Sequence, residues 1–95
     1  MKQFIDTIPV KAQTKMNRWL EMLEDRGPDL PRPYADAITG KIRELRMVFA
    51  GQHYRCLYFF DQKRIVVTHG FIKKTDEVPP GEVILAQRLM EEYFK

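Results

Sequence analysis

Three strand-like segments that follow one another through short turns constrain the fold of this chain more than any other feature. Apolar and polar residues alternate in the first, as in a strand with one covered face. The second is apolar at both odd and even positions, which predicts a central strand covered on both sides. The third is rich in β-branched residues. Because short connections favour antiparallel pairing, the sequence predicts a meander. The expected strands are residues 42–50, 54–60 and 65–72.

A helical pattern precedes these strands. From Val10 to Arg26 the apolar residues recur every three or four positions, as on one face of an α-helix. Pro9 suits the start of that helix, and Gly27 followed by Pro28 predicts its end. The expected apolar face comprises Ala12, Met16, Trp19, Leu20 and Leu23.

The remaining segments complete the predicted fold. Residues 28–40 begin as a proline-rich linker and predict a short helix over residues 34–38, closed by Gly40. A last helix is expected from Gly81 to Phe94. Residues 1–7 are only weakly strand-like and read either as an edge strand or as a loose lead-in. The predicted fold is therefore α+β: a small antiparallel β-sheet meander with two N-terminal helices packed on it and a C-terminal helix.

Composition bounds the class of protein. A chain of 95 residues, of which 44% are hydrophobic and 31% charged, fits one soluble globular domain over residues 1–95. No apolar run is long enough for a membrane helix, and the N-terminus lacks the apolar core of a secretory signal. One cysteine, Cys56, allows no intrachain disulfide, so we expect a cytoplasmic protein. Since there are two histidines and no cluster of ligand residues, we expect neither a metal site nor a cofactor.

Positive charge is concentrated in the predicted sheet. From Lys41 to Lys74 there are eight basic and two acidic residues, a balance of +6, whereas the whole chain carries +3. Like charges on neighbouring strands repel, so such a cluster favours an anionic partner such as phosphate. The competing interpretation is a solvated edge that deters aggregation. We expect these cations to be exposed, so that alanine at Arg55 or Lys73 costs little stability.

His69 and several aromatic residues lie among these cations. His69 has the parity of Phe71 and Lys73, so it reads either as a proton donor or acceptor beside a phosphate or as a half-buried structural histidine. Tyr54 and Phe71 offer rings on which RNA bases stack, although most aromatic residues of so short a chain belong to the core. His53 is placed in an exposed turn. No Ser-His-Asp grouping, paired carboxylates or phosphate-binding loop is evident, so any catalysis depends on Arg, Lys and His.

Three motifs, in this order, resemble a known family. Residues 41–46 end in Glu-Leu-Arg, residues 54–59 read Tyr-Arg-Cys-Leu-Tyr-Phe, and residues 69–75 read His-Gly-Phe-Ile-Lys-Lys-Thr. With the helices around them, over about residues 10–94, they resemble the RelE/ParE toxin superfamily and are most similar to its HigB-like, phage-derived branch. The first strand of that family is barely present in residues 1–7.

The resemblance implies the toxin of a type II toxin–antitoxin system. RelE- and HigB-like members are ribosome-dependent endoribonucleases that cut mRNA through the RNA 2′-hydroxyl, and a cognate helix-turn-helix antitoxin of the HigA type restrains them. No cofactor and no membrane is implied. The implied catalytic residues are Arg43, Arg55, Lys73 and Lys74. The implied substrate-binding residues are Arg46, Tyr54, His69, Phe71 and Thr75.

Two alternatives use the same residues. ParE-like members of the superfamily inhibit DNA gyrase by binding, and a basic face can also dock an acidic partner without any chemistry. The cluster of Arg55, Lys73 and Lys74 favours the nuclease over the gyrase inhibitor.

Overall fold

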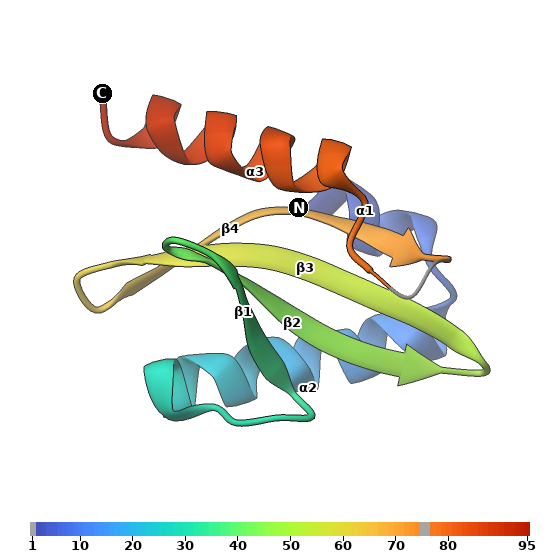
Figure 1. The fold of residues 1–95 in the computed structure, drawn as a ribbon. Coiled ribbons are helices and arrows are strands. Elements are labelled where there is room, and N and C mark those ends of the chain that lie inside the picture. The colour runs from blue at the N-terminus through green and yellow to red at the C-terminus, as the bar shows by residue number, and fades with distance from the viewer. Residues whose placement is uncertain (1, 75–76) are drawn as a thin grey trace.

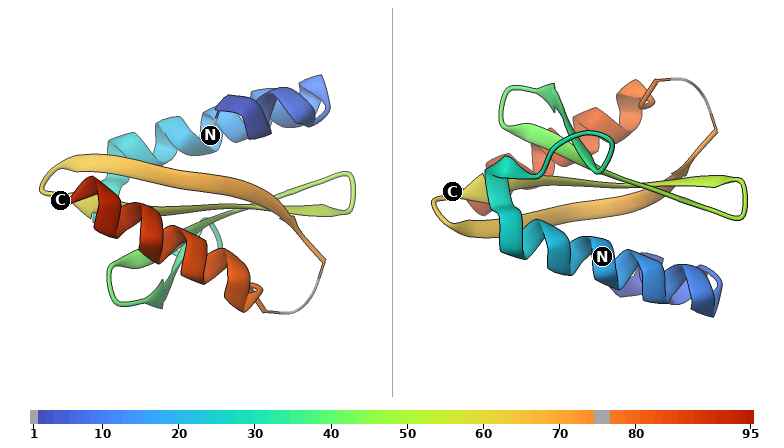
Figure 2. Two further views of the ribbon diagram at one scale, coloured as in Figure 1. Left: turned by 90° about the horizontal axis from the view of Figure 1, so that it is seen from above. Right: turned by 90° about the horizontal axis from the view of Figure 1, so that it is seen from below.

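The computed structural model describes residues 2–74 and 77–95. Its helices are α1 (Lys2–Thr7), α2 (Val10–Arg26), the 3₁₀ helix η1 (Gly27–Asp29) and α3 (Pro80–Tyr93). Its strands are β1 (Ala35–Thr39), β2 (Ile42–Phe49), β3 (Gln52–Asp61) and β4 (Arg64–Lys73). The strands form one antiparallel sheet in the order β1-β2-β3-β4, and α2 and α3 lie on its opposite faces (Figure 1, Figure 2). None of the described helices has the length and apolar character needed to cross a membrane.

The α+β class, the antiparallel meander, α2 and α3 are confirmed, with α2 ending where the sequence predicts. One difference concerns the turn between β2 and β3. It contains only Ala50 and Gly51, whose φ angles of 51° and 78° suit a tight two-residue hairpin. Phe49 therefore pairs with Gln52, and β3 begins two residues earlier than expected.

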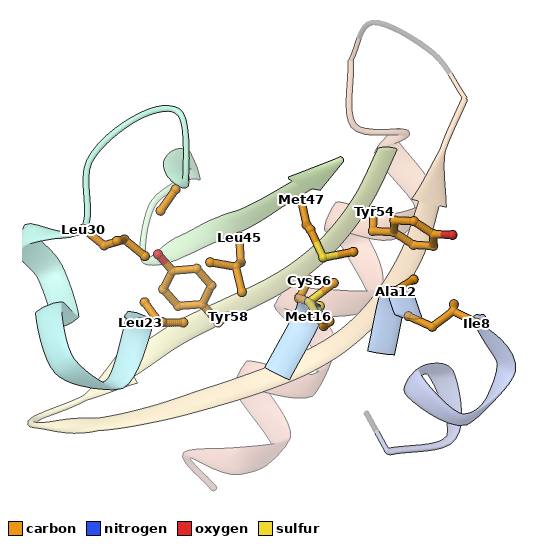
Figure 3. Close-up of a cluster of buried hydrophobic side chains, with 11 residues drawn as sticks. Ile8, Ala12, Met16, Leu23, Leu30, Leu45, Met47, Tyr54, Cys56 and Tyr58 are labelled. Carbon is orange, nitrogen blue, oxygen red and sulfur yellow. Dashed lines mark hydrogen bonds between the residues drawn. The ribbon is translucent and has the colours of Figure 1, made fainter. Parts of the chain in front are cut away.

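The larger hydrophobic core fills the space between α2 and the sheet (Figure 3). Met16 of α2 and Cys56 of β3 meet in this core, with their sulfur atoms 3.7 Å apart. A smaller core lies between α3 and the other face of the sheet, and burial of each large side chain in either core stabilises the fold by about 1.5–3 kcal/mol. The buried residues of the smaller core are Ile42, Leu57, Phe59, Phe71 and Ala86.

The helix predicted over residues 34–38 is wrong, because this segment forms strand β1. Five residues are too few for a helix to be stable on its own. As a strand they pair with β2, and they serve both cores: Ala35 is buried against α2, whereas Ile38 packs on the α3 side. Gly40, expected to end a helix, instead lies in the β1–β2 turn with φ +52°. The sheet therefore has four strands and not three.

Residues 2–7 form a helix, α1, and not the weak strand or loose lead-in that the sequence suggested. Phe4 of α1 and Ile8, which follows the end of α1, both pack on the larger core. The Phe4 ring lies over Gly70 of β4, where a Cβ atom would come within 2.3 Å of Phe4 Cδ2. Helix α1 thus packs on the α2 side of the sheet over β4. Of the two N-terminal helices that the sequence predicts, only α2 is present, and α1 was not predicted.

Candidate nucleic-acid interface

The strand register sorts the basic residues by face. Arg46 of β2 is directly opposite Arg55 of β3, and His53 of β3 is directly opposite Lys73 of β4. Directly opposed residues point to the same side of an antiparallel sheet, and so do residues two apart on one strand. Arg55 is also opposite Phe71, a member of the smaller core. All four basic side chains therefore lie on the face that α3 packs against.

Helix α3 covers only part of this face. Near its start, Glu82 lies 3.4 Å from His69, and near its end the Tyr93 hydroxyl donates a hydrogen bond of 2.8 Å to Asp61. These contacts place the helix over the half of the sheet toward the β3–β4 turn, as the ribbon shows (Figure 1). The half toward the β2–β3 turn, which carries His53 and Lys73, lies beyond the helix.

Arg55 is buried, so the expectation that it is exposed is wrong. Its exposed fraction is 2%, and its Nε atom lies 3.2 Å from Oε1 of Glu44, which is itself only 5% exposed. Its Nη1 donates to the carbonyl of Tyr54 at 3.1 Å. Burial lowers the pKa of the Arg55 guanidinium, and the attraction of Glu44 opposes that shift. Arg55 is buried because β3 is a central strand with a neighbouring strand on each side.

Glu44 also holds Arg46. The Arg46 Nε atom lies 3.3 Å from the same Oε1 atom that Arg55 contacts, and the Arg46 side chain is 34% exposed. One carboxylate therefore neutralises one of two guanidinium charges. Because Arg55 is deeply buried, the remaining positive charge is presented to solvent by Arg46.

Two of the predicted site residues lie on the other face. Arg43 is directly opposite Tyr58 and its Nε donates to the Tyr58 hydroxyl at 3.4 Å, on the α2 side of the sheet. Tyr54 is 3% exposed and belongs to the larger core. The structure therefore does not bring Arg43 or Tyr54 together with Arg46, Arg55 and Lys73.

His69 and Phe71 lie in β4, on the face that α3 packs against. His69 is half-buried: its Nδ1 lies 3.1 Å from Thr68 Oγ1, and its ring stacks on Phe71 at 5.8 Å. Phe71 is buried in the smaller core. These contacts favour the structural interpretation of His69. Lys74 is exposed just beyond β4, and Thr75 lies outside the described residues.

Two hollows adjoin Arg46. One, of about 230 Å³, is lined by residues that include Lys15 and Trp19 of α2, Tyr34, and Arg46, His53 and Arg55 of the sheet. The other, of about 400 Å³, is lined by three acids, Asp36, Glu44 and Glu77, together with Arg46 and Lys73. In the described part of the chain, no three His, Cys, Asp or Glu side chains come together as metal ligands.

The chain matches the family described as phage-derived protein Gp49-like over residues 3–91. It belongs to that family. The Gp49-like family is RelE-like and toxin-like, so membership agrees with the three motifs at the level of the superfamily and suggests an antitoxin partner. A search of curated proteins finds no match to the chain.

One residue of the candidate site is missed by reasoning from the sequence. His53 does not lie in a turn; it lies in β3, directly between Val48 and Lys73 on the face that carries Arg46. The signal in the sequence was the pair Ala50-Gly51, which suits a two-residue turn. Such a turn makes His53 part of β3, and because His53 is two residues before Arg55, both side chains lie on the same side of the strand. Arg46, His53 and Lys73 are called the open basic cluster below.

Proposed function

We propose that this Gp49-like chain is the toxin of a type II toxin–antitoxin system and an endoribonuclease that cleaves mRNA on the ribosome. The observation that carries the proposal is the open basic cluster, which places an arginine, a lysine and a histidine on three adjacent strands. Cations in such an arrangement suit the phosphates of RNA. Membership of a toxin-like family supports the same conclusion.

In the proposed reaction an RNA 2′-hydroxyl attacks the adjacent phosphorus. The bond to the 5′-oxygen of the next nucleotide breaks, leaving a 2′,3′-cyclic phosphate and a 5′-hydroxyl. Arg46 and Lys73 stabilise the negative charge that builds on the phosphate oxygens in the transition state. His53 accepts the proton of the 2′-hydroxyl and returns a proton to the leaving oxygen. No metal or cofactor has a part in these steps.

Arg55 has a positioning role in this proposal. Glu44 contacts both guanidinium groups, so Arg55 balances the charge of the carboxylate and leaves the positive charge of Arg46 for the RNA phosphate. Lys74, exposed at the end of β4, adds a cation for the RNA backbone. The proposed partners are the ribosome, mRNA and a helix-turn-helix antitoxin of the HigA type that neutralises the toxin.

Induction in a host without the antitoxin tests the proposal. We expect growth arrest and new mRNA 5′ ends within translated codons, which disappear when translation is blocked. Lys73→Ala should abolish both effects while the protein remains folded by circular dichroism. Normal growth and unchanged mRNA ends, with the wild-type protein folded and free of antitoxin, would contradict the proposal.

A non-catalytic binding role is the second candidate, because the buried ion pair neutralises Arg55 and Arg43 lies on the opposite face. A supercoiling assay with purified gyrase distinguishes a ParE-like inhibitor from the nuclease. Loss of antitoxin binding in Lys73→Ala, without any mRNA cleavage by the wild type, would instead support a docking module.

A further inference from the structure

The hollow of about 230 Å³ at the edge of β2 has a lining that favours one kind of ligand. Beyond its pairing with β1, strand β2 is an edge, and α2 covers that edge with side chains. Trp19 Nε1 donates to the Arg46 carbonyl at 2.7 Å, and the Lys15 ammonium donates to the Val48 carbonyl. These bonds hold the Trp19 ring at the wall of the hollow.

Two aromatic rings form part of this wall. Trp19 and Tyr34 meet edge to face, with their centroids 5.5 Å apart, and the Tyr34 carbonyl accepts a 2.7 Å hydrogen bond from the Arg46 amide. Both rings are therefore anchored to the strand that carries Arg46. Fixed aromatic rings are the surfaces on which unpaired bases stack.

The charge of the lining differs from that of the neighbouring cavity. None of the described residues that line this hollow is acidic, whereas Lys15, Arg46 and Arg55 are basic. The larger cavity on the other side of Arg46 includes three carboxylates. A base next to a phosphate at Arg46 therefore meets no carboxylate among the described residues on the aromatic side.

We propose that this hollow binds one unpaired base of single-stranded RNA, whose adjoining phosphate is held by Arg46. The inference rests on the proposed function and extends it from the phosphate to the base beside it. Size agrees with it, because a cavity of about 150 Å³ accepts a benzene ring and this hollow is larger. The lining is mostly hydrocarbon and ring surface, so it binds by stacking and discriminates little by hydrogen bonding.

Trp19 is the only tryptophan of the chain, so its fluorescence reports on the hollow directly. We expect a short single-stranded oligoribonucleotide to quench it saturably. An oligoribonucleotide of the same length and charge in which every base is missing should bind more weakly by about 5- to 100-fold. Inorganic phosphate should leave the emission unchanged. This comparison needs no variant of the protein.

The variant Tyr34→Ala should lose a similar factor in RNA affinity, whereas Tyr34→Phe should bind like the wild type. The slope of affinity against salt concentration should stay the same in both variants, because neither changes a phosphate contact. Equal affinity for normal and abasic RNA would overturn the proposal. So would quenching by an acidic antitoxin segment but not by RNA, which would assign the hollow to a protein partner.

The outcomes separate this inference from the proposed function. Cleavage of mRNA on ribosomes together with equal affinity for normal and abasic RNA would contradict the base site but not the proposed nuclease activity. Base-dependent quenching without any cleavage would contradict the nuclease activity but support the base site.

Discussion

Glu44 and Arg55 form a buried ion pair that crosses diagonally from β2 to β3, with Oε1 and Nε 3.2 Å apart. They are the two charged residues in the buried set of the described chain, and Arg46 shares the same carboxylate at 3.3 Å. Removing one member of such a pair leaves an uncompensated charge in the interior. The pair therefore links the stability of the sheet to the position of Arg46 at its open face.

The substitution Arg55→Ala is expected to lower the free energy of unfolding by about 3–5 kcal/mol, because the buried guanidinium is lost and the Glu44 carboxylate keeps only the part-exposed Arg46 as its partner. Urea unfolding followed by circular dichroism measures this loss. The double change Glu44→Leu with Arg55→Met should recover most of it, since well-packed apolar residues replace the pair. Lys73→Ala, at a half-buried position on β4, serves as the control and should change stability by less than about 0.5 kcal/mol. An Arg55→Ala protein as stable as the wild type would contradict this account.

The amphipathic pattern of residues 10–26 and the parities of the three main strands were readable from the sequence, because each depends on a short local period. Strand β1 was not readable, since its first three residues, Ala35, Asp36 and Ala37, are poor strand formers and their conformation comes from pairing with β2. The pairing of Arg55 with Glu44 was also hidden. It depends on the register of two strands and not on spacing along the chain.

The candidate site, too, was predictable from the sequence only in part. The sequence predicted which strands carry the cations, and the register decided which of them share a face. Arg43 and Arg46 are three residues apart in a strand, so they point to opposite sides of the sheet. His53 was misplaced because the predicted turn extended over Gln52 and His53, which belong to β3.

Gly70→Ala is expected to destabilise the fold by about 1–3 kcal/mol, because the added methyl group overlaps the Phe4 ring that holds α1 on the sheet. Thermal unfolding of the two proteins measures the difference. Phe4→Leu should cost stability in the wild type and cost less in Gly70→Ala, since the smaller side chain makes room for the methyl group. Additive effects of the two changes would show that the contact does not hold α1 in place.

Cys56 should be chemically silent in the folded protein. Its burial raises the pKa of the thiol to about 12, so at pH 8 it is protonated and shielded from reagents. We expect no reaction with an aromatic disulfide reagent until urea unfolds the chain. Rapid reaction at pH 8 under native conditions would contradict the buried position.

The same shift predicts a contribution to stability at alkaline pH. The unfolded thiol ionises near its ordinary pKa of 9.0 and the folded one near 12. The contribution is therefore complete below pH 9 and is lost as the pH rises from 9 to 12, by about 1.4 kcal/mol per pH unit at most. Between pH 9 and 11 the stability of Cys56→Ala should fall less steeply than that of the wild type, and parallel curves would refute the assignment.

The two faces of the sheet are expected to differ in their effect on RNA cleavage. Arg46→Gln and Lys73→Gln each remove a cation from the open basic cluster and should lower the rate by about 10²-fold, as loss of one transition-state donor does. Arg43→Gln removes an equal charge from the same strand as Arg46, but on the α2 side, and should retain most of the activity. The rate of mRNA cleavage in a purified translation system measures all three.

Arg43→Gln is the matched control for net charge, because it and Arg46→Gln change the total by the same amount. If simple electrostatic attraction to RNA were the whole effect, the two variants would lose activity equally and more so at low salt. A larger loss in Arg43→Gln than in Arg46→Gln would place the reacting phosphate on the α2 face. That result would exclude the open basic cluster as the site, because the sheet separates the two arginines.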